Sequence, residues 1–177
     1  MSITIQDHTK KKIVNGLTVI HEFIINDDFM NEQLVNEIEN SIDVQKNNTN
    51  VKAKMTDWWM MNNNGFKTLK IYTDEAIKKV QSLKSVKDYS FKLDNIWGVV
   101  YNKNQYTEMH DHWPATYSFV YYPNKHKDEL YFTDLNYKVN PKKGLLVIFE
   151  GHIRHEVKNT NSEFKRYCIS GNYHLIG

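Results

Sequence analysis

The chain has 177 residues, a length that fits one domain with a substantial core rather than two independent domains. Its 23 basic and 21 acidic residues leave a formal net charge of +2, which makes no case for nucleic acid or an anionic membrane as a partner. The single cysteine, Cys168, excludes an internal disulfide, so any metal site must use histidine and carboxylate ligands.

The first half of the sequence predicts one strand followed by two helices. Leu17 to Ile25 is rich in β-branched and apolar residues and predicts a strand, and Asn26 to Asp28 supplies a turn and a helix cap. Apolar residues then recur every four positions from Met30 to Ile42, which indicates a helix with one buried stripe. We expect a polar loop from Gln45 to Asn50 and a second amphipathic helix from about Phe66 to Leu83.

From Phe91 onward the sequence consists of short β-rich runs separated by turn residues, a pattern typical of a sandwich or barrel rather than a βαβ fold. We therefore expect a mainly β fold with N-terminal helices, in which two or three helices buttress a double-stranded β-helix, or jelly roll. A single domain is expected over residues 1–177, with the N-terminal strand and helical support in 1–90 and the double-stranded β-helix in 91–177. The predicted strands of this core are Asp94 to Tyr101, Thr107 to His112, Tyr117 to Tyr122, Glu129 to Thr133, Gly144 to Phe149, His155 to Lys158 and Lys165 to His174.

Three histidines are the candidate metal ligands. His110 and His112 stand two residues apart in a predicted strand, so both side chains should point to one face, and Asp111 should point to the other. His155 follows a buried run and a glycine turn, and it is the third candidate. A His-x-His pair alone is a weak signal, but three protein ligands in this order would leave open positions on a catalytic metal. Whether Asp111 rather than His112 completes the site is left open.

Arg166 is the candidate for binding an anionic ligand. It lies in the predicted strand after His155, and a hairpin between the two strands would set both side chains over one cavity. A buried guanidinium can pair bidentately with a carboxylate, whereas the competing interpretation is an ordinary surface arginine.

These motifs resemble those of a known enzyme family. The segment from Tyr101 to His112 is similar in spacing to the prolyl-4-hydroxylase-like oxygenases that depend on iron(II) and 2-oxoglutarate. The His-x-His-x-Pro run from His110 to Tyr122 resembles a 2-oxoglutarate oxygenase group of bacteria and phages. Gly144 to Val157 and Arg166 to Asn172 are similar to the closing motifs of that group, so the likeness covers roughly Asp94 to Tyr173.

The resemblance implies an enzyme, a dioxygenase that uses O₂ and 2-oxoglutarate to hydroxylate an unactivated C–H bond and releases succinate and CO₂. It implies a peptidyl substrate, for which proline is one candidate, or a small molecule. The residues that it implies as iron ligands are His110, His112 and His155. Those that it implies at the cosubstrate are Arg166, Tyr122, Tyr101 and Ser170. The chain departs from the wider superfamily at His112, where the superfamily has a carboxylate, so the iron centre would carry one more positive charge.

Two alternatives remain from other classes of protein. A cupin-type metalloprotein that does not use 2-oxoglutarate would share the histidines, but the glutamate expected shortly after His112 is missing, since Thr116 and Tyr117 stand there. A jelly-roll binding or virion module would use the histidines structurally or for zinc. No apolar run of membrane-spanning length and no signal peptide are found, so we expect a cytoplasmic protein, in the host cytoplasm if a phage encodes it. The sequence does not indicate the oligomeric state.

Overall fold

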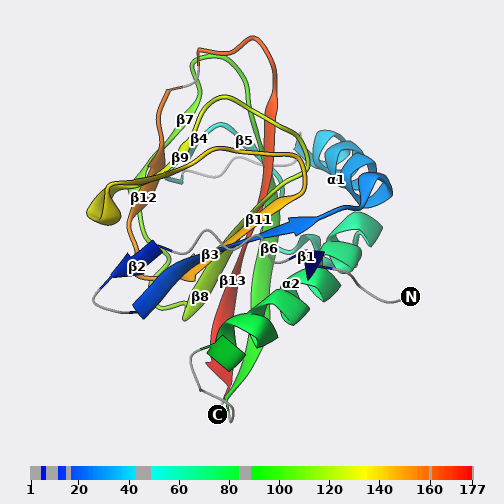
Figure 1. Ribbon diagram of the computed structural model, residues 1–177. Helices are drawn as coiled ribbons and strands as arrows, with labels where there is room; N and C mark the ends of the chain where they lie inside the picture. The colour runs from blue at the N-terminus through cyan, green and yellow to red at the C-terminus, as the bar shows by residue number, and fades with distance from the viewer. Residues whose placement is uncertain are drawn as a thin grey trace.

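The computed structural model describes residues 5–6, 12–14, 17–42, 49–83, 89–159 and 161–176. These residues form two antiparallel sheets that face each other, with two α-helices beside the larger sheet (Figure 1). The helices are α1 (Asp28–Ser41) and α2 (Asn64–Leu83), with two short 3-10 helices, η2 (Met60–Asn62) and η3 (Thr133–Leu135).

The larger sheet has the strand order β1-β3-β11-β8-β13-β6-β5, and β2 also pairs with β3. The strands of this sheet are β1 (Ile5–Gln6), β2 (Lys12–Val14), β3 (Leu17–Ile25), β5 (Lys54–Met55), β6 (Ser90–Tyr101), β8 (Tyr117–Tyr122), β11 (Leu145–Glu150) and β13 (Arg166–Ile176). The smaller sheet has the order β10-β9-β12-β7-β4. Its strands are β4 (Val51–Lys52), β7 (Tyr106–His110), β9 (Leu130–Phe132), β10 (Tyr137–Val139) and β12 (His155–Val157).

From β6 to the end of β13 the chain passes back and forth between the two sheets, with β9 and β10 together in the smaller one. This winding is that of a double-stranded β-helix, as the sequence predicts. Each of the seven strands expected in this region is present; β8 has the predicted bounds, and the other six have shifted ends. The short strands β4, β5 and β10 were not predicted, because two or three residues are too few to show a periodic pattern.

Two hydrophobic clusters hold the layers together, and they use opposite faces of the larger sheet. In β8, Tyr121 belongs to the cluster shared with the helices, whereas its neighbour Tyr122 belongs to the cluster between the sheets. Ile148 and Phe149 of β11 divide in the same way. Because side chains alternate along a strand, β8 and β11 each contribute to both clusters. The face of the larger sheet that is turned toward the smaller sheet can therefore line a cavity.

The two helices form as the sequence predicts. Asp27 caps α1 by accepting a hydrogen bond from the backbone N–H of Met30 at 2.9 Å. The predicted stripe of α1 and most of that of α2 are buried, but Leu83 is 52% exposed because it is the last residue of α2. Residues 45–48 of the predicted polar loop lie outside the described residues.

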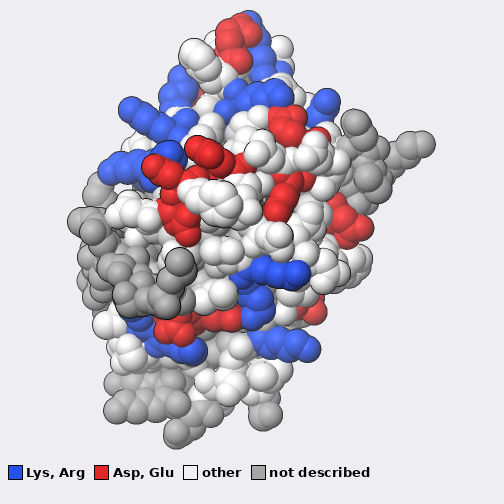
Figure 2. Space-filling model, turned by 90° about the vertical axis from the view of Figure 1, so that its right-hand side faces the viewer, with Lys and Arg blue, Asp and Glu red and all other residues white. Residues whose placement is uncertain are grey.

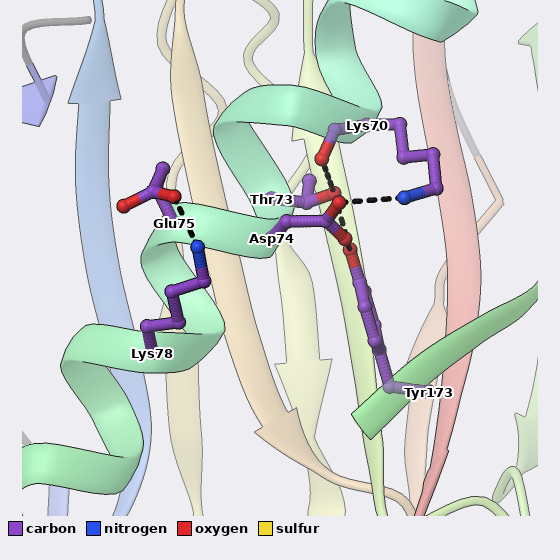
Figure 3. A network of polar contacts seen from close by, with 6 residues as sticks. All are labelled: Lys70, Thr73, Asp74, Glu75, Lys78 and Tyr173. Carbon is purple, nitrogen blue, oxygen red and sulfur yellow. Dashed lines mark hydrogen bonds and ion pairs between the residues drawn. The ribbon is translucent and has the colours of Figure 1, made fainter. Parts of the chain in front are cut away.

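A polar network attaches α2 to β13 (Figure 3). The Tyr173 hydroxyl of β13 donates to Asp74 Oδ1 at 2.7 Å and lies 2.7 Å from Thr73 Oγ1. Asp74 Oδ2 accepts from Lys70 Nζ at 2.6 Å. Because every polar atom in this contact has a partner, it fixes α2 against the strand that also carries Arg166.

The helical side of the molecule carries charges of both signs close together (Figure 2). Two ion pairs link elements that lie far apart in the sequence: Lys165 Nζ lies 2.7 Å from Glu39 Oε1, and Lys143 Nζ lies 2.7 Å from Asp28 Oδ1. Among the described residues, no helix has the length and hydrophobicity needed to cross a membrane.

Candidate active site

The three predicted histidines come together at one end of the interior. His110 ends β7 and His155 begins β12, and these two residues are paired in the smaller sheet. One ring nitrogen from each of His110, His112 and His155 lies within 4.8 Å of the others, and Nε2 of His112 is 3.3 Å from Nε2 of His155. Three imidazole nitrogens at this spacing can bind one metal ion.

His112 reaches the cluster by a route that differs from the prediction. The predicted strand extended to His112, but β7 ends at His110. The backbone N–H of His112 instead donates to the Gly151 carbonyl at 2.7 Å, and the His112 carbonyl accepts from Ala115 at 2.8 Å. A loop held to the turn before β12 therefore brings the ring of His112 to the rings of His110 and His155.

Asp111 points away from the cluster. Its side chain is exposed, and Oδ1 accepts a hydrogen bond from the backbone N–H of Trp113 at 3.0 Å. The geometry therefore favours His112 over Asp111 as the third ligand.

Two of the rings are oriented by backbone carbonyls. Nδ1 of His110 lies 2.8 Å from the Glu108 carbonyl, and Nδ1 of His155 lies 3.0 Å from the Ile153 carbonyl. A carbonyl can only accept, so each Nδ1 carries the hydrogen and each Nε2 keeps its lone pair for a metal.

Burial holds the three histidines in their neutral form. It lowers the pKa of His112 to about 3, helped by the nearby His110 ring. It also lowers the pKa of His155 well below its usual value, together with His112 and His110, and it lowers the pKa of His110. Neutral imidazole is the form that binds a metal ion, so the cluster is ready to bind at neutral pH.

These shifts predict that the metal-free protein loses stability in mild acid. The unfolded chain takes up protons on histidine near pH 6.5, whereas the folded chain does so only at lower pH. The free energy of unfolding should therefore fall as the pH drops below about 6.5, by up to ~1.4 kcal/mol per pH unit for each histidine. Urea unfolding between pH 7.5 and 5 measures this slope. His112→Asn should reduce it, and an unchanged slope in that variant would contradict the assignment.

Arg166 lies inside the molecule with unused hydrogen-bonding capacity. It is 1% exposed, and its guanidinium carbon lies 5.2 Å from the ring centre of Tyr101 and 5.4 Å from that of Tyr122. Nη2 donates to the Tyr122 hydroxyl at 3.3 Å, but Nε and Nη1 have no hydrogen-bond partner among the described residues. A buried, unpaired cation is costly, so this geometry fits a carboxylate ligand.

The predicted hairpin between the strands of His155 and Arg166 is wrong. β12 pairs with β7 and β9 in the smaller sheet, whereas β13 lies between β8 and β6 in the larger sheet. The two strands therefore lie in facing sheets, and the two side chains approach one cavity from opposite walls.

All seven predicted site residues line this cavity, which has a volume of about 40 Å³. They are His110, His112, His155, Arg166, Tyr101, Tyr122 and Ser170. The Tyr101 hydroxyl lies 2.6 Å from Thr107 Oγ1, and burial raises the pKa of Tyr122 to about 12, so that its phenol stays neutral. The side chains that line this space would have to move apart to admit a ligand larger than a water molecule or two, and a bulky molecule would have to reach the histidines from outside.

Sequence analysis did not assign a role to Asn172, whose side chain counteracts the lowering of the His112 pKa. The available signal was alternation: Arg166, Cys168 and Ser170 line the cavity, and Asn172 is the next residue in this series. The alternation pattern does not reveal that the ring of His112 would lie above Asn172.

Comparison with known proteins identifies the fold. No family model and no curated protein matches the sequence. Among solved structures, a viral collagen prolyl hydroxylase from Paramecium Bursaria Chlorella virus-1, in complex with 2-oxoglutarate, matches with a TM-score of 0.67 and 15% identity over 88% of this chain and 96% of that chain. A Pseudomonas putida prolyl-4-hydroxylase matches with a TM-score of 0.65 and 15% identity, over 89% of this chain and 93% of that one.

A prolyl hydroxylase from Trichoplax adhaerens, in complex with a peptide of hypoxia inducible factor, also matches. Its TM-score is 0.59, with 18% identity over 86% of this chain and 83% of that chain. These similarities confirm the double-stranded β-helix fold.

Proposed function

We propose that the protein is an iron(II)- and 2-oxoglutarate-dependent oxygenase. The observation that carries the proposal is a single narrow cavity with three converging imidazole nitrogens and, in the same lining, a buried guanidinium whose Nε and Nη1 have no partner among the described residues. A ligand that spans the two groups must bind a metal at one end and present a carboxylate at the other. 2-Oxoglutarate has this chemistry, and the solved structures with the same fold include a viral prolyl hydroxylase in complex with it.

The donor set fits iron(II). Three protein ligands leave positions for a bidentate keto acid and for O₂. All three ligands are neutral, so the centre keeps the full charge of the ion and should attract a dianion more strongly than a site with a carboxylate ligand. When bound, iron(II), 2-oxoglutarate and O₂ together supply the oxidation: one oxygen atom enters the C–H bond of the substrate as a hydroxyl group, the other enters succinate, and CO₂ is released.

The residues of this chain position the reactants. Arg166 would hold the distal carboxylate through Nη1 and the second N–H of Nη2, while the other N–H of Nη2 remains on the Tyr122 hydroxyl. Tyr101 and Tyr122 lie against the guanidinium and limit its movement. Ser170 lines the cavity between Arg166 and the metal end. The enclosed space keeps water away from the reacting groups.

The substrate would bind outside the cavity, beside the histidines. Met109 and Trp113, which flank the His-x-His pair in the sequence, are 50% and 76% exposed and offer apolar surface there. A peptide fits such a surface, and the Trichoplax adhaerens structure contains a peptide of hypoxia inducible factor. We therefore propose a peptidyl substrate, with proline as one candidate residue, ahead of a small molecule.

The test is a visible spectrum recorded without oxygen. Iron(II) and 2-oxoglutarate, added to the folded protein, should produce the weak charge-transfer band of the chelate, and neither should produce it alone. Admission of O₂ should remove the band and release succinate. Iron binding without any band would instead indicate a cupin-type metalloprotein, and absence of iron binding would indicate a non-catalytic jelly-roll module; either result would refute the proposal.

A further inference from the structure

Asn172 occupies the metal end of a row of side chains that faces the cavity. Asn172 follows the cavity-lining residues of β13, and its register partners are Asn95 on β6 and Ser118 on β8. It therefore lies on the central strand of three, six residues along β13 from Arg166. The two residues mark opposite ends of the same inner face.

Hydrogen bonds from both neighbours fix the orientation of the Asn172 amide. Its Nδ2 donates to Asn95 Oδ1 at 2.9 Å, and its Oδ1 accepts from Ser118 Oγ at 2.8 Å. Because Nδ2 of Asn172 points toward β6, its Oδ1 must be the atom that points toward β8. That oxygen has a second lone pair for another donor.

The ring of His112 lies above this row. Its centre is 6.0 Å from the ring of Trp97, which is stacked on it, and 6.0 Å from the ring of Phe149. Phe149 is on β11 and Trp97 is on β6, so the His112 ring lies over the two strands between them, β8 and β13, which carry Ser118 and Asn172. The Asn172 side chain also counteracts the lowering of the His112 pKa, as a hydrogen-bond acceptor beside the ring would. Because Nε2 of His112 faces His155, the nitrogen available to Asn172 is Nδ1.

We infer that Asn172 is a positioning residue that prepares His112 to bind the metal. Its amide oxygen accepts the Nδ1 hydrogen of His112, which orients the ring and leaves the Nε2 lone pair for the ion. Backbone carbonyls do this for His110 and His155, whereas His112 depends on a side chain. The inference rests on the proposed metal site, and it explains how a ligand outside the regular strand is held in place.

Titration of the metal-free protein with cobalt(II), followed by the visible absorption of the bound ion, tests this role. Asn172→Leu removes the acceptor and should weaken cobalt(II) binding by about 10- to 100-fold, the usual effect of losing such an outer partner. Asn172→Asp keeps an acceptor at the same place and should bind cobalt(II) within about threefold of the wild type, or more tightly. Ser118→Ala is the matched control, since it removes a hydrogen bond from the same amide but leaves the oxygen, and it should also stay within about threefold.

A purely structural role would give a different pattern. In that case Asn172→Leu and Ser118→Ala would lower the unfolding temperature alike and leave cobalt(II) affinity unchanged in the folded protein, which would overturn the inference. A second measurement does not depend on the leucine variant folding. In the zinc-loaded protein, Asn172→Asp should shift the proton resonance of one imidazole N–H, that of His112, and no shift would also overturn the inference. If the wild type binds neither cobalt(II) nor zinc, the proposed function fails as well; if it binds them, only the inference is at stake.

Discussion

Arg166→Met is expected to raise the KM for 2-oxoglutarate by at least ~100-fold while iron(II) binding stays close to that of the wild type. Loss of a bidentate, charge-assisted pair in a buried site costs about 2–5 kcal/mol, and methionine fills the space without replacing any donor. The metal-free variant should also be more stable than the wild type, because it no longer buries a guanidinium with two unpaired nitrogens. Succinate release against 2-oxoglutarate concentration measures the first effect, and urea unfolding measures the second.

Arg154→Met is the matched control for this variant. Arg154 is exposed, and its Nη2 pairs with Asp134 Oδ1 at 2.6 Å, outside the cavity lining. Its removal should leave the KM for 2-oxoglutarate unchanged. If Arg166→Met also left the KM unchanged, the assignment of Arg166 to the cosubstrate would be wrong.

His155→Ala should abolish turnover and lower iron(II) affinity by at least ~100-fold, because one of three protein ligands is lost. His155 is buried at the junction of the other two rings, and no other described histidine, cysteine or carboxylate joins its metal-ligating group. Metal content after dialysis and succinate release measure the two effects. His152→Ala is the control, because His152 is exposed and lies just before the same strand, and it should retain both properties. Full iron content in His155→Ala would contradict the metal assignment.

Local sequence patterns were sufficient to predict several elements of the fold. Short β-rich runs between turn residues predict β8 and β11, and the four-residue repeat from Met30 to Ile42 predicts α1, because both are local patterns in the sequence. Local spacing likewise predicts that His110 and His112 share one site, because they are two residues apart. His155 lies 43 residues beyond His112, and it was added to the site from the order of the motifs and the family resemblance.

Other features depend on contacts between distant segments and could not be derived from local patterns. β12 and β13 are consecutive in sequence, yet they lie in opposite sheets, so Arg166 faces His155 across the interior and not along a hairpin. His112 reaches the other two histidines through a loop that hydrogen-bonds to Gly151. Asn172 lies beneath the His112 ring because three strands from separate parts of the chain align in register. Side-chain periodicity determines which face of a strand is buried, whereas pairing of remote strands determines which residues meet there.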